Sequence, residues 1–390
     1  MFSERTNWRL AQNRFTQAIE EARARGAKLL DLTASNPTRV GLQYDAAGIL
    51  SAFGAPHMLD YDPQAKGLLS AREAVAAYYG DEHGVRNLDA DRIVLTTSTS
   101  EGYSFVFRLL CNARDELLVP KPSYPLFEFL AELQDVKRVP YPLIYDHGWQ
   151  MDFPSLAKAV TPRTRGVVIV HPNNPTGSYV QASELAPLNE FCRSNGLALI
   201  VDEVFLDYGL DQKPHASFAA NQDALTFTLS GLSKISALPQ MKVAWVATSG
   251  PEVEVAEAMA RLEVIADTYL SMNAPIQWAV PALLEQRKSI QRQLLDRVKA
   301  NLAELDRQVT AQTACQRLIV DGGWYAVLRV PVTRSDEELA IELVQKKSVM
   351  VHPGHFYDFP SDGYLVLSLI THEKEFSTGT ARLLQLLAPA

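Results

Sequence analysis

Cysteine is rare in this sequence, and the three that are present lie far apart. Cys111, Cys192 and Cys315 form no C-x-x-C pair, which argues against both a disulfide framework and a zinc site. The eight histidines show no H-E-x-x-H spacing, so we expect no dedicated metal site. Reduced, mostly buried thiols in a cytoplasmic protein are the expectation.

Long apolar runs and an excess of positive charge are also missing. No run approaches eighteen apolar residues, and the N-terminal stretch MFSERTNWRLAQNRF lacks the apolar core of a signal peptide, so neither a membrane span nor a leader is expected. Lys and Arg number 37 against 45 Asp and Glu, and the net charge of −8 argues against a general nucleic-acid-binding surface. A content of 47% hydrophobic and 21% charged residues excludes disorder, and 390 residues suffice for two domains.

Strand-like and helix-like segments alternate through the middle of the chain. The segments VVIV at 167–170 and LALIV at 197–201 are continuously apolar, as expected of a sheet that helices cover on both faces. We therefore predict an α/β fold, with a mostly parallel sheet sandwiched by helices, in a large domain of residues 46–284.

The two ends of the chain are predicted to form a smaller α+β domain, made of residues 1–45 plus 285–390. Its strands are expected in WYAVLRV, SVMVHPG and GYLVLSLI, and residues 252–310 are predicted to be helical. Near the N-terminus, Leu10, Phe15 and Ile19 fall close to helical spacing, which predicts a helix from about Glu4 to a C-cap at Gly26.

Chemically suggestive side chains follow the predicted strands, and the carboxyl ends of parallel strands share one edge of a sheet. Ser98, Thr99 and Ser100 begin a helix whose free N–H groups can bind an anion, although an ordinary helix cap is the alternative. Tyr124, between two prolines, can serve as a platform for a flat ring, or it can be a packed loop tyrosine.

The next strands end in amide, carboxylate and amine groups. Asn173 and Asn174, in HPNNPTG, can donate to a ligand or close a turn. Asp202 ends an apolar strand and needs a cation, a metal or hydrogen bonds, and a structural salt bridge would satisfy it. Lys234 can be a surface residue, or a Schiff-base lysine whose pKa is lowered by burial or by a cation such as Lys242, which can itself bind phosphate.

Together these groups match the needs of one molecule, pyridoxal 5'-phosphate, which is flat, phosphorylated, basic and an aldehyde. The sequence resembles the class I/II aminotransferase family, pyridoxal-phosphate enzymes of fold type I, over nearly the whole chain. The motifs HPNNPTG, VDEVF and SGLSKISALPQMKVAW carry most of this resemblance.

The resemblance implies roles for individual residues. Lys234 would form the Schiff base with the cofactor and shuttle a proton, and Asp202 would pair with the pyridine nitrogen. Asn174 would donate to the phenolic oxygen, and Tyr124 would stack on the ring. The implied phosphate contacts are Ser98, Thr99, Ser100, Ser230, Ser233 and Lys242.

The resemblance also implies a homodimer with shared active sites. Tyr61 resembles a tyrosine that reaches the phosphate bound by the neighbouring subunit, and Ser271 would lie near that boundary. Asn36, in ASNPT, is the best candidate for a substrate contact on the N-terminal segment.

Three positions depart from the family pattern. Lys242 replaces the usual arginine on the phosphate, and Phe205 replaces a tyrosine that donates to the phenolic oxygen. Val366 stands where members carry the arginine that grips the substrate carboxylate. We hypothesise that His355 takes over this task, with His352, Arg329 and Asn36 as the other candidates.

The predicted function is amino transfer from an amino acid, or an amine, to a 2-oxo acid, with small molecules as the only partners besides a second subunit. Because of Val366, a pyridoxal-phosphate lyase or decarboxylase is the alternative. A nicotinamide dehydrogenase is disfavoured because no G-x-G-x-x-G follows the first strands. A non-catalytic cofactor-binding protein is disfavoured because Lys234 is present.

Overall fold

The computed structural model describes residues 1–388 except 9, 87 and 212. An eight-stranded sheet forms its centre, with the strand order β2-β9-β8-β7-β6-β3-β4-β5. The strands from β8 through β4 in this order run parallel, whereas β9 and β5 are antiparallel to their neighbours. Their bounds are β2 Ile93–Thr96, β3 Glu116–Lys121, β4 Lys137–Tyr145, β5 Trp149–Met151, β6 Thr164–Val170, β7 Ala198–Asp202, β8 Thr226–Gly231 and β9 Ala244–Ser249.

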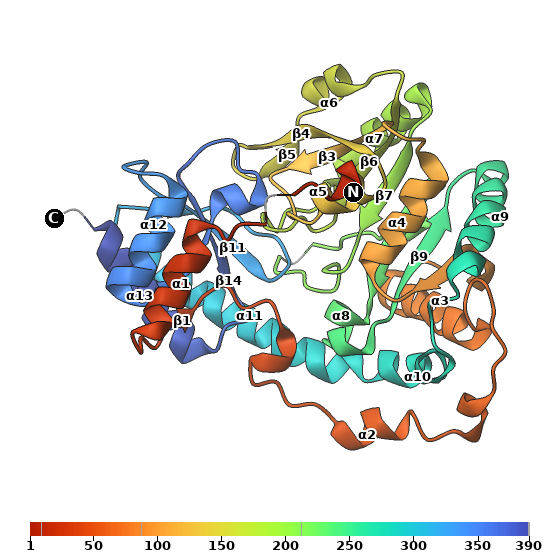
Figure 1. Ribbon diagram of the computed structural model, residues 1–390, viewed down its shortest axis with the longest axis horizontal. Coiled ribbons are helices and arrows are strands. Elements are labelled where there is room, and N and C mark those ends of the chain that lie inside the picture. Colours follow the sequence, from red (N-terminus) through yellow and green to blue (C-terminus); the bar gives the residue numbers. More distant parts are fainter. Residues whose placement is uncertain (9, 87, 212, 389–390) are drawn as a thin grey trace.

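Helices cover both faces of this sheet (Figure 1). One face packs against α4 (Thr99–Leu110), α5 (Phe127–Leu133) and α9 (Glu252–Tyr269). The other face packs against a second set of helices, α3 Leu69–His83, α6 Phe153–Ala159, α7 Ala182–Asn195, α8 Leu232–Ile235 and α10 Ala274–Glu285. The predicted sandwich is confirmed, and it buries β6 and β7 almost completely.

A smaller four-stranded antiparallel sheet has the order β10-β11-β14-β13. The strands are β10 Gln316–Arg317, β11 Tyr325–Arg329, β13 His352–Pro353 and β14 Tyr364–Ser368, and a separate parallel pair joins β1 Leu30–Asp31 to β12 Val349–Met350. The helices α1 Arg14–Ala24, α12 Asp336–Glu342 and α13 Glu373–Leu387 share a hydrophobic core with this sheet. The expected α+β character of this part is therefore present.

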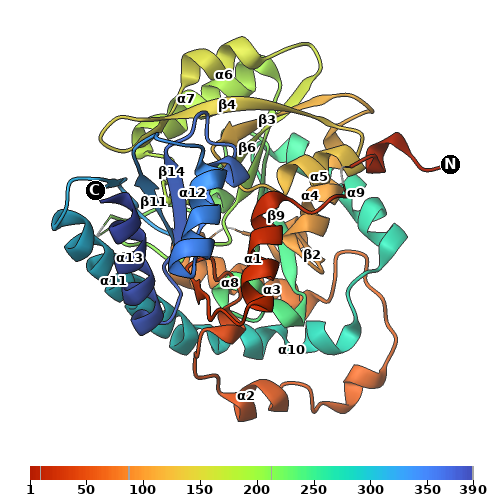
Figure 2. The same ribbon diagram turned by 60° about the vertical axis from the view of Figure 1, so that its left-hand side comes forward.

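The long helix α11 (Arg287–Thr310) runs from the small sheet to α10, as Figure 2 also shows. Its buried Leu294, Val298 and Leu305 belong to the core of the small sheet. The short helix α2 (Ala46–Ser51) lies below α10 in both views. The division of the chain at 45/46 and 284/285 stays a prediction.

The N-terminal helix begins later than predicted, at Arg14 rather than Glu4. The side chain of Asn13 accepts a hydrogen bond from the N–H of Thr16 at 2.7 Å, which caps the helix at that point. Leu10 is therefore outside the helix and largely exposed, so its assignment to the helix was wrong. Gly26 follows the helix with a positive φ of 79°, as expected of a residue at a helix end.

The carboxyl ends of β2, β3, β6, β7 and β8 all lie at one edge of the large sheet. The antiparallel β9 begins at the same edge, just after Lys242. The shared edge confirms the expectation that the segments following these strands meet.

Candidate active site

Lys234 lies on α8, the short helix that follows β8. Gly231 permits this transition, because a Cβ at that position would lie 2.7 Å from the carbonyl oxygen of Val243. The hydroxyl of Tyr208 donates to the carbonyl of Lys234 at 2.7 Å, and Tyr44 donates to the carbonyl of Ala237 at 2.8 Å. Two tyrosines thus hold the backbone of the lysine-bearing helix.

The amine of Lys234 lies beside two aromatic rings, and the residue as a whole is half-buried. Its Nζ lies 5.1 Å from the centre of the Trp324 ring and 5.7 Å from that of Phe205. Burial lowers the pKa of Lys234 to about 8, and the attraction of Asp202 opposes that shift. The proposal that Lys242 lowers this pKa was wrong, because desolvation is the cause and Lys242 is exposed.

Asp202 ends β7 with a buried side chain. Its Oδ1 accepts the N–H of Val204 at 3.1 Å, and its Oδ2 accepts the hydroxyl of Tyr103 at 3.1 Å. Burial raises the pKa of Asp202 to about 6, although both hydrogen bonds and Lys234 favour the ionised form. No salt bridge satisfies Asp202 within the described residues, so that alternative does not hold.

The two asparagines after β6 have different surroundings. Asn173 accepts hydrogen bonds from the N–H and the hydroxyl of Thr176, so it closes the turn. Asn174 is also buried, yet its Oδ1 has no hydrogen-bond partner in the part of the chain that is described. A buried amide oxygen without a hydrogen-bond partner lowers the free energy of unfolding unless a ligand supplies the partner. In this respect Asn174 differs from Asn173.

Tyr124 follows β3, with 40% of its surface exposed. The charge of Asp202 contributes, after burial, to the raised pKa of Tyr124, so the two residues lie near each other. The adjacent Ser123 is buried and its hydroxyl has no partner among the described groups. Its N–H donates to the carbonyl of Tyr357 at 2.9 Å, which ties this loop to the small sheet's side of the molecule.

The N-terminus of α4 is a capped helix start. Ser98 Oγ accepts the N–H of Glu101 at 3.2 Å, so Ser98 is an N-cap, and Thr99 and Ser100 are the first helical residues. The side chain of Glu101 turns back to the N–H of Thr97 at 2.7 Å. The cap and the anion-binding interpretation are compatible, because the N–H groups of Thr99 and Ser100 donate to no group of the described residues.

The remaining predicted phosphate contacts differ in their burial and in their hydrogen bonds and salt bridges. Ser230 is buried, and its hydroxyl donates to the carbonyl of Glu203 at 3.4 Å. Ser233 is half-buried on α8. Lys242 is exposed, in the left-handed region with a φ of 53°, and within the described chain it forms no salt bridge.

The outlying candidates lie apart from these groups. Tyr61 is 84% exposed. Asn36 caps a short turn by accepting the N–H and hydroxyl of Thr38, and His355 is exposed with its ring edge-on to Phe356. Among the described residues, no hydrogen bond joins Asn36 or His355 to the groups around Lys234.

Sequence reasoning missed Tyr103, Trp324 and Tyr325. Tyr103 resembles any apolar residue on the buried face of α4, and only packing across the sheet brings it to Asp202. Trp324 and Tyr325 belong to a predicted strand of the other domain. The only sequence signal for Trp324 and Tyr325 was the pair of glycines that precedes them, and Gly323 has a positive φ of 83°.

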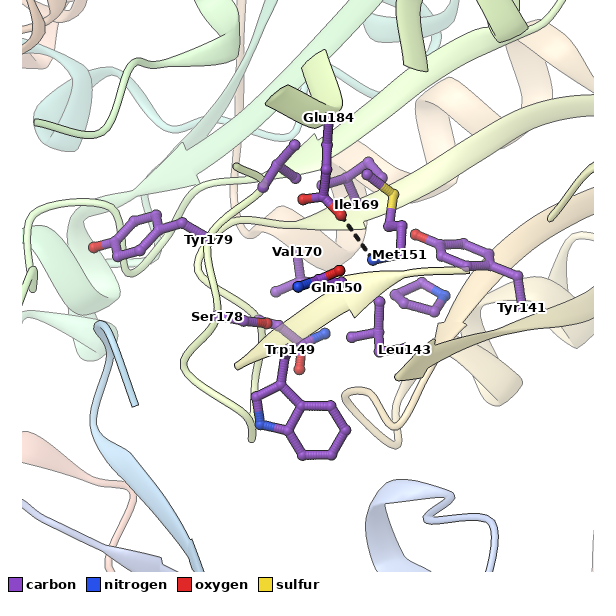
Figure 3. A pocket seen from close by; sticks show the side chains of 13 residues that line it. Tyr141, Leu143, Trp149, Gln150, Met151, Ile169, Val170, Ser178, Tyr179 and Glu184 are labelled. Atoms are coloured by element: carbon purple, nitrogen blue, oxygen red, sulfur yellow. Dashed lines mark hydrogen bonds between the residues drawn. The ribbon is translucent and has the colours of Figure 1, made fainter. Parts of the chain in front are cut away.

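A small cavity lies behind the Asn173 loop, between β5 and Ser178 to Val180 (Figure 3). Its volume is about 20 Å³, room for one water molecule. The carboxylate of Glu184 at its border already accepts the N–H groups of Met151 and Gln181, both at 2.8 Å. We therefore assign no ligand to it.

No group of His, Cys, Asp and Glu side chains in the described chain is arranged to hold a metal ion. None of the described helices combines the length and the apolar character needed to cross a membrane.

Comparison with known proteins finds aminotransferases. The chain is 29% identical to the glutamate-pyruvate aminotransferase AlaA of Haemophilus influenzae over 375 residues, 92% of this chain and 91% of the relative. It is 27% identical to an alanine aminotransferase of Mycobacterium tuberculosis, over 92% of this chain and 86% of the relative. The fold matches that of an alanine aminotransferase from Pyrococcus furiosus, with a TM-score of 0.90 and 21% identity over 99% of both chains.

These relatives favour amino transfer over the lyase and decarboxylase alternatives. The family description that matches, over residues 49–374, is "Aminotransferase class I and II". This chain therefore belongs to the class I and II aminotransferases and is a pyridoxal-phosphate-dependent enzyme that transfers amino groups.

Proposed function

We propose that Lys234 binds pyridoxal 5'-phosphate covalently and relays the proton during amino transfer from an amino acid to a 2-oxo acid. The observation that carries this proposal is a lysine amine beside the rings of Trp324 and Phe205, whose pKa burial lowers to about 8 against the attraction of Asp202. Such an amine is partly neutral near physiological pH, as a nucleophile must be.

The surroundings of Lys234 fit the cofactor. Asn174 Oδ1 and Ser123 Oγ are buried polar atoms without partners among the described residues, which a polar ligand would satisfy. Because an amide's O and N are assigned from their surroundings, Asn174 can equally present its NH₂ to the phenolic oxygen. The exposed Lys242 and the start of α4 provide positive potential for a phosphate.

The bound cofactor supplies an electron sink that weakens the bonds at the substrate's α-carbon. Asp202, fixed by Tyr103 and Val204, holds a proton at the pyridine nitrogen. The amine of Lys234 would accept the proton from the substrate α-carbon and would pass it to the cofactor. The rings of Phe205 and Trp324 limit the access of water to that amine.

We propose alanine or glutamate as the amino donor and pyruvate or a related 2-oxo acid as the acceptor. The names of the relatives from Haemophilus influenzae and Mycobacterium tuberculosis, glutamate-pyruvate aminotransferase and alanine aminotransferase, support this choice. The test mixes holoenzyme with single amino acids and amines and follows the absorbance of the bound cofactor. Conversion to the amino form with release of a 2-oxo acid is expected, whereas release of ammonia or carbon dioxide without conversion would refute it.

The proposal includes a cytoplasmic homodimer with shared active sites, in which Tyr61 reaches the partner's phosphate. It is supported by the exposure of Tyr61 and Leu59 and by the open cavity that Tyr61 and Ser271 border. Mixing Tyr61→Ala and Lys234→Ala subunits tests it. Shared sites predict that a heterodimer regains one intact site, while unshared sites predict no recovery beyond the activity of the Tyr61→Ala parent.

A further inference from the structure

One face of the small sheet looks toward Lys234. Cross-strand pairing sets Tyr325 opposite Ser368 and Val327 opposite Val366, so these side chains share a face. The Tyr325 ring lies 6.3 Å from the Phe205 ring and perpendicular to it, and Phe205 borders the Lys234 amine. The Tyr325 end of this face is therefore separated from the reacting lysine by the ring of Phe205.

Positive charge is nearly absent from this face. Val366 and Val327 are buried and apolar. Arg329 lies at the far end, where its guanidinium carbon is 5.5 Å from the Tyr145 ring and 5.9 Å from the Tyr364 ring. His352 pairs with Val366 across β13 and β14, and burial lowers its pKa to about 4, so its imidazole is neutral at pH 7.

Hydroxyl groups are the donors that remain. Ser368 donates its hydroxyl to the carbonyl of Ala34. Tyr357 has its hydroxyl 2.9 Å from Nδ1 of His352. The Tyr325 side chain is only 8% exposed, and its hydroxyl has no hydrogen-bond partner among the described residues.

Tyr325 is within electrostatic reach of Tyr124, on the loop that follows β3. Tyr124 contributes, after burial, to the raised pKa of Tyr325, which indicates that the two rings are close. Because its pKa is raised, the hydroxyl stays protonated at neutral pH and can donate. No described residue occupies this donor, so it can bind an acceptor that enters the site, and a substrate carboxylate would supply one.

We propose that the Tyr325 hydroxyl binds the carboxylate of the amino-acid and 2-oxo-acid substrates, in a subsite built from neutral donors. The proposal rests on the proposed function, because it needs a carboxylate-bearing substrate beside Lys234. It assigns to Tyr325 the task first sought in His355, which is exposed and makes its ring contact with Phe356. Tyr325 would then determine specificity for acids over amines.

The test compares Tyr325→Phe with wild-type holoenzyme in binding two ligands, followed by cofactor absorbance. One ligand is the best amino-acid donor of the panel, and the other is the amine that lacks its carboxylate. Loss of one hydrogen bond to a carboxylate should weaken binding of the amino acid about 10- to 100-fold. The affinity for the amine should change less than about threefold.

The matched control is Tyr357→Phe, which removes a hydroxyl already engaged with His352. It should leave the preference for the acid over the amine unchanged. Equal weakening of both ligands in Tyr325→Phe, no weakening of either, or the same loss of preference in Tyr357→Phe would each overturn the assignment. Failure of wild-type enzyme to convert with any amino acid would instead refute the proposed function.

Discussion

Tyr103→Phe tests how the hydrogen bond from Tyr103 affects the pKa of the Asp202 carboxylate and the stability of the fold. The substitution removes one hydroxyl that donates to Oδ2 at 3.1 Å inside the core. A hydrogen bond to an ionised group contributes about 1.5–3 kcal/mol, against about 0.5–1.5 kcal/mol for a neutral pair. The loss of unfolding free energy in the cofactor-free protein should therefore be larger at pH 8, where Asp202 is ionised, than at pH 5, where it is protonated.

The assay is urea unfolding of wild type and variant at both pH values, because the bond favours the charged form and its loss raises the pKa of Asp202 further. Tyr141→Phe is the control, since Tyr141 is equally buried and donates to the carbonyl of Val168 at 2.9 Å. That control should lose about 1 kcal/mol at either pH. An equal loss at pH 5 and pH 8 in Tyr103→Phe would refute the reasoning.

Three further outcomes are expected. Burial raises the pKa of Glu203 from 4.5 to about 7. The contribution of Glu203 to the free energy of unfolding is therefore fully present below pH 4.5 and is lost as the pH rises through 7. Glu203→Gln should flatten this decline by about 2–3 kcal/mol in urea titrations, and parallel profiles would contradict the assignment. Lys242→Ala should weaken cofactor binding in equilibrium dialysis about tenfold or more, whereas Lys242→Arg should retain it, and an unchanged affinity in Lys242→Ala would remove Lys242 from the phosphate site. Tyr208→Phe should lower the free energy of unfolding by about 1 kcal/mol, because the 2.7 Å bond to the Lys234 carbonyl is lost, and an unaltered denaturation midpoint would show that this bond is dispensable.

The positions of the site residues along the sheet could be predicted because local patterns determine them. Continuous apolar runs mark β6 and β7, and parallel strands bring their following loops to one edge. Asn174, Asp202 and Lys234 each lie at or shortly after the end of a strand, so an ordered list of strands was enough to place them at the same edge of the sheet.

Contacts between distant segments could not be predicted in the same way. Tyr103 and Asp202 are 99 residues apart, and only the packing of α4 across the sheet joins them. Tyr325 looked like one apolar strand residue among several, and its unpaired hydroxyl depends on how the small sheet faces the large one. The start of α1 was misplaced because helical spacing extended beyond the cap that Asn13 provides.

The most direct test of the central claim is to identify the lysine that carries the cofactor. Reduction of the holoenzyme with borohydride fixes the bound cofactor covalently, and peptide mass mapping then locates it. A single modified residue is expected, Lys234, in the segment that follows β8. Modification of Lys242 in its place, or of no lysine in this segment, would contradict this expectation.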